Sequence, residues 1–222
     1  MKNLILHTSM KLLAGIILTS MLIFLPAGSI YFWQGWLLMP TLFIPVLISG
    51  ILMLILNPQL LRKRLNDKEK EKEQKLIIRV SSILFGSMFI VSGLNYRYGW
   101  THMPETISSC AVGTYLIGYC LYAEVLRENP YLSRTIETSA DQKLISTGLY
   151  SLVRHPMYTS TIIMFLSIPL ILGSFPSLLI MLLYIPVINY RIKHEETFLE
   201  KNLQGYSAYK QKVRYRIIPF IW

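Results

Sequence analysis

Two long stretches without a charged side chain dominate this sequence. No Asp, Glu, Lys or Arg occurs between Lys11 and Arg62, or between Arg154 and Arg191. A helix that crosses the ~30 Å hydrocarbon core of a bilayer needs about 20 apolar residues, so each stretch can hold a helical hairpin. The whole chain is 53% hydrophobic and only 15% charged. These features predict an all-α, polytopic integral membrane protein, and they exclude a water-soluble globule, a disordered chain and a secreted disulfide scaffold.

The apolar residues fall into six segments. They span approximately residues 11–31, 36–56, 76–96, 106–126, 156–172 and 176–190. The last two are short and meet at a Gly/Ser/Pro turn, so they predict either two spans or a tilted, partly buried hairpin. Pro169 and Pro186 predict kinks within them. We expect a bundle of about five to six transmembrane helices, with residues 1–126 as a four-helix membrane region and residues 127–222 as a separate functional region.

The basic residues indicate an orientation rather than a nucleic-acid partner. The net charge is +10, but the basic run at residues 62–75 alternates with acidic residues, which is typical of a solvated loop. With six crossings, every Lys and Arg except Arg97 falls on one side. The positive-inside rule then predicts a multi-pass protein of the cytoplasmic (plasma or inner) membrane with both termini cytoplasmic. The N-terminal segment superficially fits a signal peptide, but we expect it to be retained as the first membrane helix.

Polar residues that can do chemistry occur in two cytoplasmic stretches, residues 129–158 and 191–222. They flank the last hairpin, so its folding brings their near ends together. His155 and Tyr158 share one helix face, and Pro156 suits the first turn of that helix, whose free N–H groups favour a carboxylate or phosphate. The alternative is that Arg154 and His155 only mark the water boundary, with Tyr158 as an interfacial anchor.

A second group of polar residues begins the other stretch. Arg191 and Glu195 lie at i, i+4, so they form either one wall of a site or an exposed ion pair of small energetic value. Glu195 and Glu196 are adjacent and point about 100° apart, so only one of them can face a given pocket. From Lys201 onward the charges predict a solvated or membrane-surface helix.

Several common signatures are missing from the chain. There is no G-x-G-x-x-G, no P-loop, no serine nucleophile elbow and no Cys/His spacing typical of a metal site. The residue pattern therefore predicts a polar, metal-free site on the cytoplasmic face of a helical bundle, without a Rossmann sheet.

One string is more specific than the spacing arguments. Residues 147–158 read TGLYSLVRHPMY, and an apolar hairpin, Glu195-Glu196, Tyr206-x-x-Tyr209 and a closing Ile-Pro-Phe follow. This pattern, over residues 129–222, resembles the isoprenylcysteine carboxyl methyltransferase family, and related membrane phospholipid N-methyltransferases share much of it. The resemblance implies methyl transfer from S-adenosylmethionine to a lipophilic acceptor, most closely an isoprenylcysteine-like carboxylate, with residues 127–222 as the catalytic region.

The resemblance also implies roles for individual residues. Arg191 matches a position that contacts the methyl acceptor. The family often has His where this chain has Gln142, which weakens the transfer at Gln142 and Lys143. The implied cofactor-binding residues are Gln142, Lys143, Leu144, Ile145, Tyr150, His155, Pro156, Met157, Tyr158 and Glu195.

Other functions remain open at this point. Within the same chemistry, the acceptor is alternatively a phospholipid amine. A membrane reductase that uses a nicotinamide cofactor is a more distant alternative. A transporter or scaffold is a further alternative, although a transporter is expected to carry ionisable residues inside its spans, and the first three segments are nearly empty of them. The expected partners are the lipid bilayer and a lipophilic or prenylated substrate, and no nucleic acid.

Overall fold

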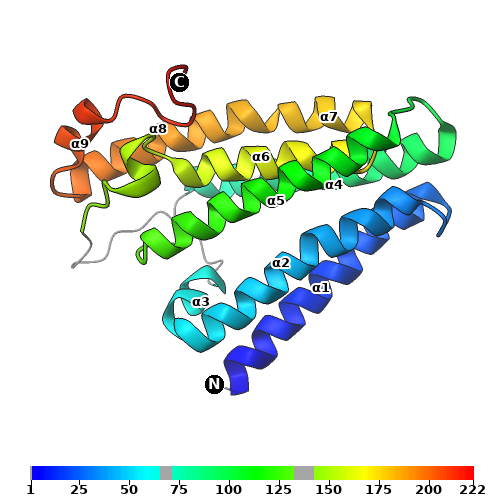
Figure 1. Cartoon of the computed structure of the whole chain (residues 1–222), viewed down its shortest axis with the longest axis horizontal. Coiled ribbons are helices and arrows are strands. Elements are labelled where there is room, and N and C mark those ends of the chain that lie inside the picture. Colours follow the sequence, from blue (N-terminus) through cyan, green and yellow to red (C-terminus); the bar gives the residue numbers. More distant parts are fainter. Residues whose placement is uncertain (1, 66–71, 133–142) are drawn as a thin grey trace.

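The computed structural model describes residues 2–65, 72–132 and 143–222 as an elongated helical bundle (Figure 1). Over these residues all regular structure is helical. The prediction of an all-α fold without a Rossmann sheet is therefore confirmed. The elements in chain order are α1 (Lys2–Ala27), α2 (Trp33–Leu56), α3 (Pro58–Leu65), α4 (Lys72–Tyr98), α5 (Glu105–Glu128), the 3-10 turn η1 (Gly148–Ser151), α6 (Pro156–Ile171), α7 (Phe175–Leu182), α8 (Tyr184–Asn202) and α9 (Tyr206–Lys212).

Five segments are long and apolar enough to cross a membrane. They are Asn3–Ala27, Trp33–Leu56, Lys75–Tyr98, Glu105–Glu128 and Phe175–Asn202. The chain is thus a multi-pass membrane protein, as its composition predicts. The last hairpin is asymmetric: α6 is a shorter apolar helix, whereas α7 and α8 together make a 28-residue arm. That arm continues past the predicted end at residue 190 because a polar, site-forming segment extends the helix to Asn202.

The two prolines of this hairpin behave differently. The helix is interrupted at Leu183, between α7 and α8. Pro186 explains the position, because it has no N–H to donate to the carbonyl of residue 182 and its ring crowds that carbonyl. Pro169 lies near the end of α6, which continues without a break to Ile171. The sequence-predicted kink at Pro186 therefore coincides with an interruption, and the one at Pro169 does not.

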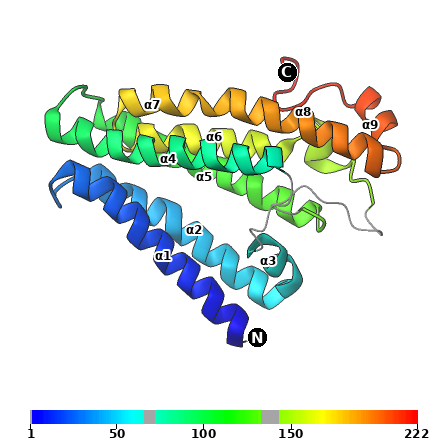
Figure 2. The same cartoon turned by 180° about the vertical axis from the view of Figure 1, so that it is seen from behind.

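The α1–α2 hairpin packs most closely on α4 at one end of the bundle. There, α1 and α4 approach closely at Gly93, where an added Cβ would lie 2.5 Å from the carbonyl oxygen of Ile23. Next to this contact the rings of Phe32 and Tyr96 stack at 4.4 Å. Toward the N-terminus and α3 the hairpin diverges from α4 (Figures 1 and 2).

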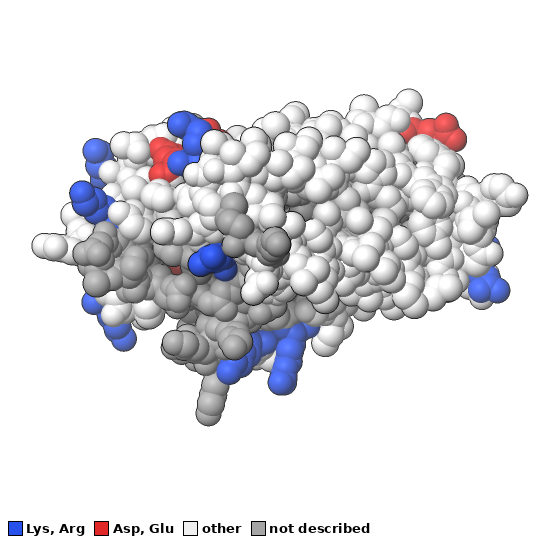
Figure 3. Space-filling model, turned by 90° about the horizontal axis from the view of Figure 1, so that it is seen from below, with Lys and Arg blue, Asp and Glu red and all other residues white. Residues whose placement is uncertain are grey.

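Charged side chains are distributed unevenly along the long axis. On the face seen in Figure 3, most lie toward the end that carries α9, and a few lie at the opposite end. A broad band between them, to the right of centre, shows no charged side chain. This distribution suits a molecule whose middle contacts lipid.

Candidate functional site

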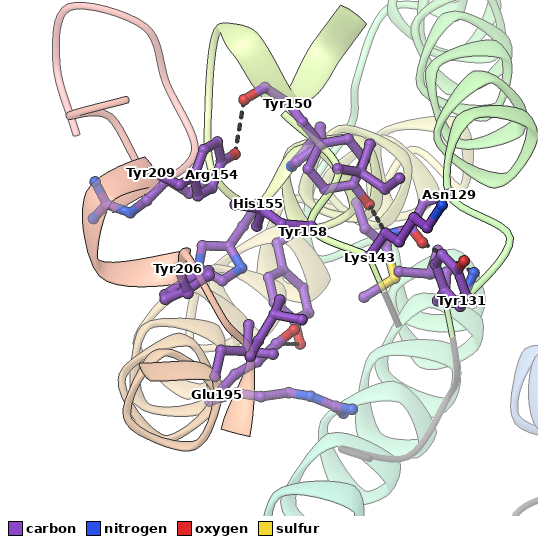
Figure 4. A pocket seen from close by; sticks show the side chains of 18 residues that line it. Asn129, Tyr131, Lys143, Tyr150, Arg154, His155, Tyr158, Glu195, Tyr206 and Tyr209 are labelled. Atoms are coloured by element: carbon purple, nitrogen blue, oxygen red, sulfur yellow. Dashed lines mark hydrogen bonds between the residues drawn. The ribbon is translucent and has the colours of Figure 1, made fainter. Parts of the chain in front are cut away.

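A solvent-open cavity lies at the end of the bundle where η1, the start of α6, α8 and α9 meet (Figure 4). It encloses about 860 Å³ of space, part of which is open to solvent. Of the sequence-predicted site residues, Gln142 lies outside the described residues. All the others line this one cavity: Lys143, Leu144, Ile145, Tyr150, His155, Pro156, Met157, Tyr158, Arg191 and Glu195.

The turn at Gly148 brings Tyr150 to the cavity wall. Gly148 has a φ of +49°, and a Cβ at this position would overlap the carboxylate of Glu128. That carboxylate accepts hydrogen bonds from the Thr147 hydroxyl (3.0 Å) and the Leu149 N–H (3.2 Å). Glycine is required here because a side chain disfavours the left-handed conformation and would displace Glu128. The carboxylate therefore fixes the turn that positions Tyr150.

The Tyr150 hydroxyl is fixed by a hydrogen bond and remains protonated. It accepts a hydrogen bond from Asn129 Nδ2 at 2.9 Å, and its backbone carbonyl accepts one from the Tyr209 hydroxyl at 2.7 Å. Burial raises the pKa of Tyr150 to about 12, and it raises the pKa of Tyr206 and Tyr209 as well. All three phenols are therefore neutral near pH 7, and because the Tyr209 hydroxyl already donates to the Tyr150 carbonyl, those of Tyr150 and Tyr206 are the ones that can donate to a ligand.

Tyr158, Glu195 and Arg191 form the opposite wall. The Tyr158 hydroxyl donates a hydrogen bond to Glu195 Oε2 at 2.5 Å. The Arg191 guanidinium carbon lies 5.9 Å from the centroid of the Tyr158 ring. Glu195 lines the cavity, whereas Glu196 does not, so the structure distinguishes the two adjacent glutamates. The cavity wall thus combines a carboxylate, a cation and an aromatic face.

Glu196 instead occupies the centre of a buried ion cluster behind the wall. Its side chain accepts from Arg154 Nε at 2.8 Å, lies 3.3 Å from His155 Nε2, and accepts from Arg216 Nη2 at 3.1 Å. Arg154 is only 7% exposed and Glu196 only 2% exposed. The interpretation of Arg154 and His155 as markers of the water boundary is therefore wrong. Both side chains are buried because each lies against the buried carboxylate of Glu196.

The C-terminal tail packs against Arg154 and His155 rather than remaining a solvated helix. After α9, Tyr215 and Arg216 accept hydrogen bonds through their carbonyls from the backbone N–H groups of Arg154 and His155, at 2.9 and 2.8 Å. Arg154 Nη1 also donates to two carbonyls of the tail at 2.7 Å. The prediction of a solvated or membrane-surface helix from Lys201 onward is wrong in this part, because the tail supplies the backbone acceptors that satisfy a buried arginine.

Sequence reasoning missed several residues that line the cavity. They are Asn129, Tyr131, Leu132, Arg154, Leu199, Leu203, Tyr206 and Tyr209. The pair Tyr206 and Tyr209 carried a signal, since tyrosines three apart share a helix face. The Tyr206 hydroxyl oxygen is buried and has no hydrogen-bond partner among the described residues, and such an atom at a cavity wall favours a bound polar group. Leu199 and Leu203 carried no signal, because apolar residues on a half-buried helix are ordinary.

The described residues contain no group of three or more His, Cys, Asp and Glu side chains able to hold a metal ion. The cavity instead offers aromatic faces, neutral phenols, one carboxylate and cationic groups from Lys143 and Arg191. This mixture suits an organic ligand that carries both charges and an apolar part.

The model of the family described as phospholipid methyltransferase matches residues 106–205, which include all of α5 but its first residue, the cavity-forming turn, the last hairpin and the whole of α8. No curated protein matches the chain.

Proposed function

We propose that the chain is a membrane methyltransferase, because the phospholipid methyltransferase model matches residues 106–205 and that family belongs to a group that also includes the isoprenylcysteine carboxyl methyltransferases. On that premise we propose that the chain transfers a methyl group from S-adenosylmethionine to a lipophilic acceptor, with the chemistry in the cavity described above. The observation that carries the proposal is that Tyr158, bonded to Glu195, and Arg191 face one cavity within the matched region.

The cavity residues fit S-adenosylmethionine, which is the methyl donor that such a family generally implies. That molecule carries a sulfonium and an ammonium, both cationic, and a carboxylate. Glu195 and the faces of Tyr150 and Tyr158 favour cations, and the Tyr206 hydroxyl is a buried donor without a partner among the described residues. Lys143 is a candidate for the carboxylate. Leu144, Met157, Leu199 and Leu203 would exclude water.

The bound cofactor would supply a methyl group on a positively charged sulfur. A lone pair of the acceptor would bond to that methyl carbon as the carbon–sulfur bond breaks, which would leave the sulfur as a neutral thioether. For such an in-line displacement the protein's contribution is positioning and exclusion of water. Arg191 would hold an anionic group of the acceptor, and the Tyr158 hydroxyl would keep the Glu195 carboxylate in place.

The acceptor decides whether a base is needed. A carboxylate, as in an isoprenylcysteine, reacts without losing a proton. An amine, as in a phospholipid headgroup, must lose one for each methyl gained. Nε2 of His155 is close to buried Glu196, whereas Glu195 faces the cavity, so Glu195 is the candidate base for an amine. Both acceptors are lipophilic, and the family match by itself favours neither over the other.

A methyl-transfer assay tests the proposal. Purified protein is incubated with cofactor labelled on its methyl group and with lipids extracted from its native membrane. We expect label in a lipid product; carboxyl esters release it in base, whereas methylated amines retain it. Folded protein that labels no lipid with any extract would overturn the proposal.

Variants then separate the roles of the residues. Loss of a hydrogen bond to a charged group costs about 1.5–3 kcal/mol, so Glu195→Gln should weaken cofactor binding about tenfold or more. Arg191→Gln should mainly lower turnover, since it faces the acceptor. Glu200→Gln, in an exposed pair with Lys210, is the matched control and should change neither quantity.

A further inference from the structure

A second, larger hollow lies outside the cavity, between the α1–α2 hairpin and the α5–α6 pair. It encloses about 1600 Å³ of space, much of it open to the surroundings, and we call it the hairpin groove. Its walls are mainly apolar and aromatic. They include Phe43 and Leu47 on α2, Tyr115 and Tyr119 on α5, and Met164 and Phe165 on α6. Much of the groove therefore comes from residues that precede the segment matched by the family model.

Hydrogen bonds join the two walls of the groove in the middle, and a helix contact closes it at one end. The hydroxyls of Ser49 and Tyr119 are 2.6 Å apart, and the Tyr119 hydroxyl is 2.9 Å from the Pro45 carbonyl, which joins α2 to α5. At the far end the α1–α4 contact at Gly93 closes the hairpin against the bundle. The groove walls come mainly from α1, α2 and α5, which are long and apolar enough to cross a membrane, so lipid chains are the expected neighbours of its opening.

Basic side chains mark the end of the groove nearest the cavity. Lys11 and Arg64 both line it. Lys11 Nζ donates to the Leu65 carbonyl at 2.8 Å, and the Arg64 guanidinium carbon lies 5.3 Å from the Tyr122 ring centroid. An ammonium has three donors and a guanidinium five, so both groups can bind an anion as well. Arg in particular matches the geometry of a phosphate.

Two helices connect the groove to the cavity. On α5, Tyr115, Tyr119, Tyr122 and Leu126 line the groove at intervals of three or four residues, and Asn129, three residues further on, lines the cavity. These intervals place them on one helix face.

The same continuity holds on α6. Met157 and Tyr158 line the cavity, and Thr161, Met164 and Phe165 continue the face into the groove.

We propose that the hairpin groove binds the acyl chains of one membrane phospholipid, with its phosphate at Arg64 and Lys11 and its headgroup directed along α5 and α6 into the cavity. An elongated amphiphile with an anionic centre matches an apolar trough that ends in two cations. The identity of this lipid as the methyl acceptor rests on the proposed function, but its binding does not. The N-terminal hairpin then acts as the lipid-selecting part of the molecule.

A photo-crosslinking experiment tests the groove. The full chain is reconstituted in nanodiscs that contain phosphatidylethanolamine with a photoactivatable group on one acyl chain, and labelled peptides are identified by mass spectrometry. Leu47→Trp fills the groove, and Leu52→Trp is the matched control, since Leu52 is about equally exposed (51% against 46%) on the same helix but does not line the groove. We expect label on residues 43–54 and 115–126 in wild type and Leu52→Trp, and loss of that label in Leu47→Trp.

Two variants that each remove one positive charge from α3 test the phosphate site. Arg64→Gln should weaken phosphatidylethanolamine binding about tenfold, whereas Arg62→Gln, on the exposed face of α3, should leave it unchanged. Cofactor affinity, measured separately, should be the same in all four variants, which shows that the cavity is intact. Equal groove labelling in Leu47→Trp and Leu52→Trp, or preferential labelling by a prenyl-chain probe, would overturn the proposal. Wild type that labels in the groove but binds no cofactor would refute the proposed function and leave the groove proposal standing.

Discussion

At the scale of single residues, the buried carboxylate of Glu196 is the group on which the stability of the site most depends. It neutralises Arg154 at 2.8 Å, and both side chains are almost fully buried. Breaking a buried pair by removing one charge costs about 3–5 kcal/mol, because the partner is left uncompensated. We therefore expect Glu196→Gln to lower the midpoint of thermal unfolding in detergent substantially.

A surface pair on the same helix provides the control. Glu200 and Lys210 are 2.7 Å apart, but their side chains are 37% and 35% exposed. Exposed pairs contribute about 0–1 kcal/mol, so Glu200→Gln should shift the unfolding midpoint little. Equal shifts in the two variants would contradict the burial argument.

Residues that line the cavity wall could be predicted from the sequence, but the buried ion pair behind that wall could not. Tyr158, Glu195 and Arg191 were expected together because the last hairpin brings their segments to one membrane face, and they do line one cavity. Arg154 and Glu196 are 42 positions apart, and nothing in their spacing says that they meet. A charge next to an apolar segment looks the same in sequence whether it marks the water boundary or lies buried in a pair.

At the scale of the element, the turn at Gly148 controls the cavity. Gly148 and Gly99 both have positive φ, +49° and +62°. A non-glycine residue in this conformation costs roughly 1–2 kcal/mol, so either substitution by Ala should destabilise the fold. Gly148→Ala should in addition weaken cofactor binding, because it displaces Glu128 and with it the turn that carries Tyr150. Gly99→Ala, far from the cavity, should leave cofactor binding unchanged. Titration of both variants with S-adenosylmethionine tests this difference.

The contact between α1 and α4 depends on Gly93, and Gly86 on the same helix is its control. A Cβ at Gly93 would press on the backbone of Ile23 and Ala27, whereas one at Gly86 would meet nothing within 4 Å. Overpacking costs about 1–3 kcal/mol, so Gly93→Ala should lower the unfolding midpoint. Gly86→Ala should leave it equal or raise it slightly, since Ala is the better helix former. The opposite order would show that the hairpin does not pack as described.

Helix existence could be predicted from the sequence more reliably than helix ends. Long apolar runs have one stable arrangement in a bilayer, so α1, α2, α4 and α5 are where hydropathy placed them. The first helix begins nine residues before the predicted start at Lys11, because polar residues at a helix end lie outside the hydrocarbon and do not stop the helix. The short helices α3 and α9 have little hydropathy signal, and they depend on tertiary contacts.

At the scale of the whole molecule, we propose that the end with the cavity faces the cytoplasm. Every Lys and Arg except Arg97 is expected on that side. In a background where Cys110 and Cys120 are replaced by Ala, Thr101→Cys should react with a membrane-impermeant maleimide on intact cells. Asn202→Cys should react only after the membrane is opened. Reversed labelling would refute the orientation.

The central claim is that the cavity of this membrane protein binds S-adenosylmethionine. The most direct measurement is a calorimetric titration of the purified, full-length protein with that molecule. We predict saturable binding at one site in wild type, weakened by Glu195→Gln and by Tyr158→Ala, and unchanged in Glu200→Gln. Absence of saturable binding in wild type that unfolds cooperatively, or equal affinity in all four proteins, would contradict the claim.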